Sequence, residues 1–138
     1  MIYYSHSEAE TMALAARLTT QISGGQICLF GEMGTGKTVF VRGFLTAMGY
    51  TGEVTSPTFA LCHRYSTSKT VLHYDLYRLN GYDDLYSIGF FDEPEDTIQL
   101  IEWSENAEDY LAPNHISVYF SYGKQPKERV LRLEGVTL

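Results

Sequence analysis

Apolar positions along the chain alternate between helical spacing and short runs of strand length. Apolar residues fall four apart between residues 14 and 22, which predicts a helix with one apolar stripe. Ser5 and Ser7 each have a glutamate three residues on, so either serine could cap the start of this helix. An apolar run over 26–30 predicts a buried strand, and apolar positions from 39 to 48 return to helical spacing.

The second half of the chain is richer in strand patterns. The predicted strands are 59–65, 70–76, 97–101, 115–121 and 129–133, with short helices around 83–88 and 104–111. Polar turns join the first two of these strands and the last two, so each pair is expected to form a hairpin. Residues 1–4 are an apolar start to which no element is assigned. Strands that alternate with helices predict an α/β fold.

A glycine-rich loop stands between the strand at 26–30 and the next helix. Its sequence, Gly31-Glu32-Met33-Gly34-Thr35-Gly36-Lys37-Thr38, has the Gly-x-x-x-x-Gly-Lys-Thr pattern of a phosphate-binding loop. Glycines let consecutive amide groups turn toward phosphate oxygens, and the helix adds its positive end. The predicted nucleotide contacts here are Gly31, Met33, Gly34, Thr35, Gly36, Lys37, Thr38 and Val39.

Two of these residues have predicted chemical roles. Lys37 would reach the β- and γ-phosphates, and the Thr38 hydroxyl would coordinate Mg²⁺. The alternative, a glycine-rich hairpin that binds nothing, is disfavoured by the strand-loop-helix setting. The motif makes the expected fold a three-layer α/β domain of the P-loop NTPase kind, with a mainly parallel central sheet and antiparallel additions.

Carboxylates end two further predicted strands. Asp75 closes the apolar run that precedes it, and Glu102 follows 97–101. Ligands of parallel α/β sheets bind outside the carboxyl ends of the strands, so both acids are expected beside the phosphate loop. Asp75 would orient Mg²⁺ or its water, and Glu102 would bind the ion or position the attacking water. A strand-end aspartate can also be a simple cap or turn residue.

The loop Thr55-Ser56-Pro57-Thr58-Phe59 carries three hydroxyl groups. It could contact the γ-phosphate or its metal and so sense the state of the nucleotide. A polar loop that leads into a strand is the other interpretation, and the sequence leaves both open.

Composition narrows the class of protein. With 138 residues and 44% hydrophobic content, the chain is expected to be a single domain over 1–138. Ten basic residues against seventeen acidic ones give a net charge of −7, which disfavours a broad direct contact with nucleic acid. Cys28, Cys62 and the four histidines lack metal-ligand spacing. No signal peptide or long apolar run is present, so a cytoplasmic protein without a membrane contact is expected.

Four ordered motifs resemble one family. Gly-Glu-Met-Gly-Thr-Gly-Lys-Thr, Thr-Ser-Pro-Thr-Phe, His-Tyr-Asp-Leu-Tyr-Arg-Leu and Ile-Glu-Trp are similar to those of the bacterial TsaE (YjeE) family, over nearly the whole chain. The resemblance implies a P-loop ATPase that uses ATP and Mg²⁺ and joins the TsaB and TsaD proteins. Its nucleotide cycle would support formation of N6-threonylcarbamoyladenosine at position 37 of tRNAs reading codons that begin with A, with tRNA contacted only indirectly.

The resemblance also implies roles for single residues. Thr38 and Glu102 would be the magnesium ligands, and Asp75 the Walker-B-type acid. Further nucleotide contacts would come from the segment that includes Glu8 and Thr11 and from the last hairpin, near Lys127 or Arg129. Many members have a threonine where this chain has Val39, which puts one polar contact on the α-phosphate side in doubt.

Other function classes stay open. The chain could be a nucleotide-dependent regulatory binding module in which hydrolysis is incidental. A small P-loop kinase is weakened because no arginine-rich lid segment is visible. A GTPase is weakened because the chain has no Asn-Lys-x-Asp motif to recognise guanine.

Overall fold

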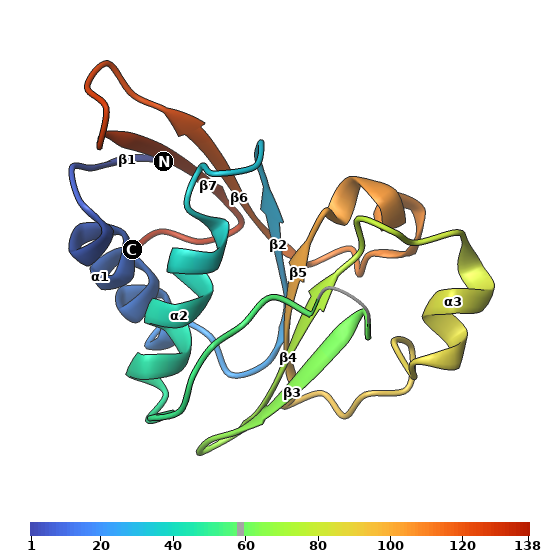
Figure 1. Cartoon of the computed structure of the whole chain (residues 1–138). Coiled ribbons are helices and arrows are strands. Elements are labelled where there is room, and N and C mark those ends of the chain that lie inside the picture. The colour runs from blue at the N-terminus through green and yellow to red at the C-terminus, as the bar shows by residue number, and fades with distance from the viewer. Residues whose placement is uncertain (58–59) are drawn as a thin grey trace.

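A computed structural model describes residues 1–57 and 60–138, which form a seven-stranded sheet with helices on both faces (Figure 1). The elements in chain order are β1 Ile2–Ser5, α1 Glu8–Thr19, β2 Gly25–Phe30, α2 Lys37–Ala47, β3 Cys62–Ser66, β4 Thr70–Asp75, α3 Tyr82–Ser87, β5 Ile98–Glu102, the 3-10 helix η1 Ser104–Tyr110, β6 Ile116–Tyr122 and β7 Arg129–Glu134. The described residues contain no helix long and apolar enough to span a lipid bilayer.

The strand order is β1-β7-β6-β2-β5-β4-β3. The four central strands β6, β2, β5 and β4 are parallel, whereas β1, β7 and β3 pair antiparallel at the two sides. This arrangement confirms the predicted fold class. Leu29 of β2 pairs with Glu102 of β5, and Glu102 pairs with Asp75 of β4. The carboxyl ends of these three strands therefore lie at one edge.

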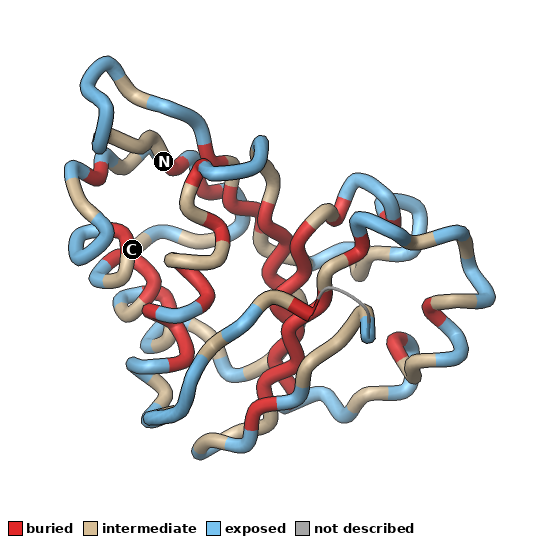
Figure 2. The backbone as a smooth tube through the Cα atoms, in the orientation of Figure 1, coloured by how far each residue is buried: buried red, intermediate tan, exposed pale blue. Residues whose placement is uncertain are grey.

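Two hydrophobic cores lie on opposite faces of the sheet. The first packs α1 and α2 against the strands and includes Leu18, Phe40 and Phe44. The second lies under α3 and η1 and includes Tyr74 and Leu85. The central strands are buried along much of their length because both faces are covered (Figure 2). Helices, sheet and helices thus form three layers.

The helices α1 and α2 approach each other closely at Gly43. A Cβ placed on Gly43 would lie 2.5 Å from the Cα of Met12 in α1. Only a residue without a side chain fits this distance. The two helices that begin beside the phosphate loop are therefore held together by a backbone contact.

Most predicted elements are present, with shifted ends. Ser7, not Ser5, caps α1, because its hydroxyl accepts a hydrogen bond from the amide of Glu10 at 3.1 Å. The strand predicted from residue 59 begins at Cys62, and Phe59 lies outside the described residues. The helix predicted at 104–111 is a 3-10 helix with a kink at Ala107. Residues 2–5, for which the sequence pattern predicts no element, form β1 and pair with β7.

Candidate nucleotide-binding site

A pocket of about 800 Å³ opens at the edge where β2, β4 and β5 end. The predicted site residues that line it are Glu8, Thr11, Met33, Gly34, Gly36, Lys37, Thr38, Val39, Asp75, Glu102 and Lys127. Ser7, Ala9, Ser56, Trp103 and Arg129 complete the lining. Segments from both ends of the chain and from its middle therefore meet in one cavity.

The phosphate loop takes a shape that only glycine allows at two positions. Gly36 has φ of 105° and stands at the N-terminus of α2, where no side chain caps the free amides. A Cβ on Gly31 would lie 2.8 Å from the carbonyl oxygen of Phe120. Gly36 therefore leaves the first-turn amides open to an anion, and Gly31 lets the loop pass close to β6.

Two predicted contacts do not line the pocket. Gly31 is packed against Phe120, and Thr35 is 2% exposed, with its hydroxyl donating to the carbonyl oxygen of Glu32 at 2.6 Å. Both residues help to hold the loop in shape. Their contact with nucleotide stays a prediction. The hydroxyl of Tyr122 adds a further tie by donating to the carbonyl oxygen of Met33 at 3.0 Å.

Lys37 is held across the loop. Its Nζ donates to the carbonyl oxygen of Gly31 at 2.6 Å and lies 4.1 Å from the centre of the Trp103 ring. The side chain is only 6% exposed, so the carbonyl and the ring replace part of the water that a free ammonium group would have. An incoming phosphate would meet a cation already placed inside the cavity.

Asp75 links the end of β4 to the preceding loop. Its Oδ2 accepts a hydrogen bond from the Ser56 hydroxyl at 3.3 Å, and its Oδ1 accepts one from the amide of Tyr77 at 3.1 Å. Ser56 also lines the pocket, so the loop around residue 55 does reach the site. Thr58 and Phe59 of the same predicted motif lie outside the described residues.

Glu102 has a partner that the sequence did not suggest. Its Oε2 lies 2.5 Å from Nε2 of His73, and both side chains are buried. Val71 and Leu100 belong to the core under α1 and α2, so His73 and Glu102, each two residues further along a strand, point to that same side of the sheet. Among the described residues Nδ1 of His73 has no hydrogen-bond partner. In the described part of the chain the imidazole ring is therefore held through Nε2 alone.

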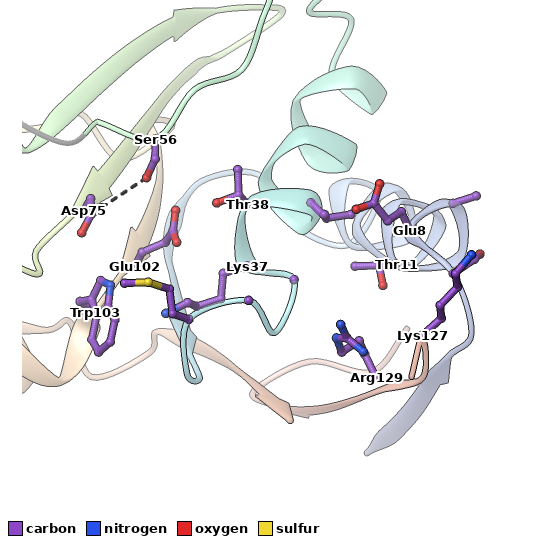
Figure 3. A pocket seen from close by; sticks show the side chains of 16 residues that line it. Glu8, Thr11, Lys37, Thr38, Ser56, Asp75, Glu102, Trp103, Lys127 and Arg129 are labelled. Carbon is purple, nitrogen blue, oxygen red and sulfur yellow. Dashed lines mark hydrogen bonds between the residues drawn. The ribbon is translucent and has the colours of Figure 1, made fainter. Parts of the chain in front are cut away.

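Figure 3 shows how the lining divides into two ends. Thr38, Asp75 and Glu102 lie toward one end of the pocket, and Glu8, Thr11, Lys127 and Arg129 lie toward the other. One end therefore gathers hydroxyl and carboxylate oxygens. The other carries two cations and a glutamate.

The far end is held by its own contacts. The Thr11 hydroxyl lies 2.6 Å from the buried hydroxyl of Ser5, and the Arg129 guanidinium lies 4.8 Å from the centre of the Tyr122 ring. The family resemblance implies a nucleotide contact near Lys127 or Arg129. The structure places both Lys127 and Arg129 on the pocket.

The two cysteines do not offer an alternative catalytic nucleophile. Burial raises the pKa of Cys28 to about 11, and burial also raises the pKa of Cys62 to about 11. Both thiols therefore stay protonated at neutral pH and are poor nucleophiles. In the described ranges no group of three or more His, Cys, Asp and Glu side chains could hold a metal ion alone. A cation here would need ligands in addition to these side chains.

Comparison with known proteins gives a consistent result. Residues 5–131 match the family described as threonylcarbamoyl adenosine biosynthesis protein TsaE. Over 116 residues the chain is 39% identical to the tRNA threonylcarbamoyladenosine biosynthesis protein TsaE of Rickettsia felis, covering 82% of this chain and 68% of that protein. The protein of the same name from Haemophilus influenzae is 40% identical over 98 residues, covering 70% of this chain and 62% of the relative.

A solved structure agrees with these matches. The crystal structure of Bacillus subtilus YdiB superposes with a TM-score of 0.78 at 25% identity, covering 95% of this chain and 82% of that one. The chain spans about two thirds of the length of the two relatives above.

Proposed function

Because the chain belongs to the TsaE family, we propose that it is the ATP-binding and ATP-hydrolysing component of a tRNA-modifying machinery. The modification is N6-threonylcarbamoyladenosine at position 37 of tRNAs reading codons that begin with A. Its named relatives are biosynthesis proteins of this modified nucleoside. The observation that carries the ATPase proposal is that the phosphate loop, Asp75 and Glu102 line one pocket.

The two ends of the pocket suggest how ATP lies in it. The triphosphate occupies the end where α2 begins, because uncapped amides and Lys37 offer positive charge there. The nucleoside extends toward Glu8, Thr11, Lys127 and Arg129. Val39 also lines the pocket but brings no hydroxyl to the α-phosphate.

The donor set near Thr38 suits Mg²⁺. The Thr38 hydroxyl and the carboxylates of Asp75 and Glu102 are hard oxygen donors, and this ion is typically bound through one or two carboxylates together with substrate phosphates. Bound there, the ion would offset phosphate charge during transfer. Thr38 and Glu102 are the proposed direct ligands, with Asp75 held by Ser56 beside them.

His73 acts on the chemistry through Glu102. Its Nε2 engages one carboxylate oxygen, Oε2, and so fixes the plane of the carboxyl group. The other oxygen, Oε1, is left for the metal side or the attacking water. A buried partner of this kind orients a functional carboxylate without touching the substrate, so His73 is a positioning residue.

Partners are needed for efficient turnover in this proposal. Arg129 is the arginine among the described pocket residues, and its guanidinium packs on Tyr122 and donates to the carbonyl oxygen of Pro126, at the nucleoside end. Within the described ranges no arginine lines the phosphate end of the pocket, so hydrolysis by the chain alone is slow. The proposed partners are the TsaB and TsaD proteins, which would contact tRNA in place of this acidic chain.

The domain organisation and the location of the protein complete the proposed function. Residues 1–138 act as one domain, which is supported by a sheet that runs through all the described parts of the chain. The protein works in the cytoplasm, which is supported by two cysteines that are not joined in a disulfide.

Complementation tests this function. Bacterial cells depleted of their own TsaE would carry this chain, its Lys37→Ala or Glu102→Gln variant, or the control Glu53→Gln, which changes an exposed carboxylate in the loop after α2. Threonylcarbamoyladenosine is then measured by mass spectrometry of hydrolysed tRNA. We expect the unmodified chain and the control to restore the nucleoside and the two site variants to fail at equal protein level.

Two results would contradict the proposal in different ways. No restoration by the unmodified chain would remove the assigned pathway. Restoration by both site variants would instead favour a nucleotide-dependent binding module in which hydrolysis is incidental.

A further inference from the structure

The stretch from residue 79 to 123 has an unusual charge. It contains ten carboxylates and neither lysine nor arginine. The acids are Asp83, Asp84, Asp92, Glu93, Glu95, Asp96, Glu102, Glu105, Glu108 and Asp109. Seven of them are exposed, and Glu102 is buried in the pocket described above. The layer that α3 and η1 build on one face of the sheet is therefore strongly acidic (Figure 1).

Exposed aromatic residues are interleaved with these acids along the chain. Tyr82, Tyr86, Phe91 and Tyr110, which we term the aromatic surface, are 48, 64, 40 and 38% exposed. The ring of Tyr82 lies 6.3, 5.2 and 5.6 Å from those of Tyr86, Phe91 and Tyr110. The four rings expose on the order of 400 Å² together, the size of patch that often marks an interaction site.

The aromatic surface cannot retreat into the protein. Phe91 packs edge-on against Phe90 at 5.3 Å, and Phe90 packs against the fully buried Tyr74 at 5.2 Å. The space beneath is thus already filled by the second core. Solvent-facing rings on a filled core are available only to something that binds from outside.

We propose that the aromatic surface is a docking site for a protein whose facing surface presents arginine and lysine side chains around an apolar centre. Cations would stack on the tyrosine rings and pair with the surrounding carboxylates. The tyrosines would supply large contact area at the centre of the interface, where such residues dominate binding energy. RNA does not fit this surface, because the exposed acids would repel its phosphates.

A partner docked on the aromatic surface would contact η1, which follows directly after the strand that ends at Glu102. The helix η1 starts two residues after Glu102 and ends at Tyr110 of the aromatic surface. Ser104 and Asn106 tie it down by donating to the carbonyl oxygens of Ile101 at 2.7 Å and Leu76 at 2.8 Å. A partner on this surface would therefore influence the position of Glu102.

A binding measurement with matched variants tests the inference, which rests on the proposed function for its probe. Purified TsaB and TsaD proteins of a related bacterium are titrated onto the immobilised full chain. We expect Tyr86→Ser to weaken binding by about 10-fold or more and Asp92→Lys by about 3- to 10-fold at low salt. The control Tyr4→Ser, which removes a tyrosine that is 60% exposed on β1, should change the Kd by less than about 2-fold.

The possible results of this binding experiment separate the docking site from the proposed partnership. Thermal unfolding and ATP binding must be unchanged in the variants, which shows that they fold. If the unmodified chain binds the probe and both variants bind equally well, the docking site is refuted while the proposed function stands. If the unmodified chain binds neither protein, the proposed partnership fails and this inference fails with it. Tyr86-dependent dimers in sedimentation, or Tyr86-dependent binding of tRNA alone, would also overturn it in favour of a second copy or an RNA.

Discussion

The two faces of the central sheet are covered in different ways. On one face, α1 and α2 are 12 and 11 residues long and touch through the backbone at Gly43. On the other, α3 has six residues, η1 is a kinked 3-10 helix, and aromatic rings stay open to solvent. Charge follows the same division, because Lys37, Lys127 and Arg129 line the pocket whereas residues 79–123 contain neither lysine nor arginine. The closely packed side with basic residues in its pocket suits a nucleotide, and the side with exposed rings and acids suits a protein.

Substitution of Glu102, at the carboxyl end of β5, should have the largest effect on activity. Glu102→Gln keeps the shape of the side chain but removes its charge, so we expect kcat for ATP hydrolysis to fall by about 100- to 1000-fold. The Kd for ATP in the absence of metal should change by less than about 3-fold, because binding depends on the phosphate loop. Steady-state kinetics and fluorescence titration measure the two constants. Equal kcat values for Glu102→Gln and the exposed control Glu105→Gln would remove the assigned role.

Truncating a side chain in the core under α3 should lower stability without changing ATP binding in the pocket. Leu85→Ala removes a fully buried side chain, which should lower the free energy of unfolding by about 2–3 kcal/mol. The Kd for ATP should stay within about 2-fold of the unmodified value, because Leu85 lies on the face opposite α2. Denaturant unfolding and ATP titration test both statements. Weakened ATP binding in this variant would show that the two faces are not independent.

The phosphate loop should depend on its lysine. The described pocket lining has two lysines, and Lys127 lies at the far end. Lys37→Ala therefore removes the lysine at the uncapped start of α2. Loss of one charge-assisted contact to phosphate should weaken ATP binding by about 10- to 100-fold. Isothermal titration measures the change, with Lys69→Ala as the control, because Lys69 Nζ donates to the carbonyl oxygen of Ser23 outside the site. Equal ATP affinity of the Lys37 variant and the control would count against a triphosphate in this loop.

The close contact of α1 and α2 should give the smallest of these effects. Gly43→Ala places a Cβ 2.5 Å from the Cα of Met12, so α1 must shift. Overpacking should outweigh the gain in helix propensity and lower the free energy of unfolding by about 1–2 kcal/mol. Because α1 carries Glu8 and Thr11, ATP binding should also weaken by a few fold. Thr46→Ala, an exposed change in the same helix, is the control for propensity, and a Gly43 variant as stable as this control would contradict the close contact.

Local patterns were sufficient to predict the phosphate loop, the helices around it and the acids at the strand ends. These features depend on neighbouring residues, and the parallel order of the strands then brings Asp75 and Glu102 together. In contrast, β1 is a strand only because it pairs with β7, more than a hundred residues away. The contact of His73 with Glu102 and that of Lys37 with Trp103 likewise join separate segments. One sequence signal could have predicted the His73 contact. His73 and Asp75 are two residues apart on one strand, so both face the same side of β4, toward Glu102.

A crystal of the protein with Mn²⁺ and a non-hydrolysable ATP analogue tests the central claim most directly, because manganese is located by its anomalous scattering. The account predicts one strong peak within about 2.5 Å of the Thr38 hydroxyl oxygen and of a Glu102 carboxylate oxygen, with the γ-phosphate beside it. A peak bonded to neither residue, or an analogue bound away from the phosphate loop, would contradict the account.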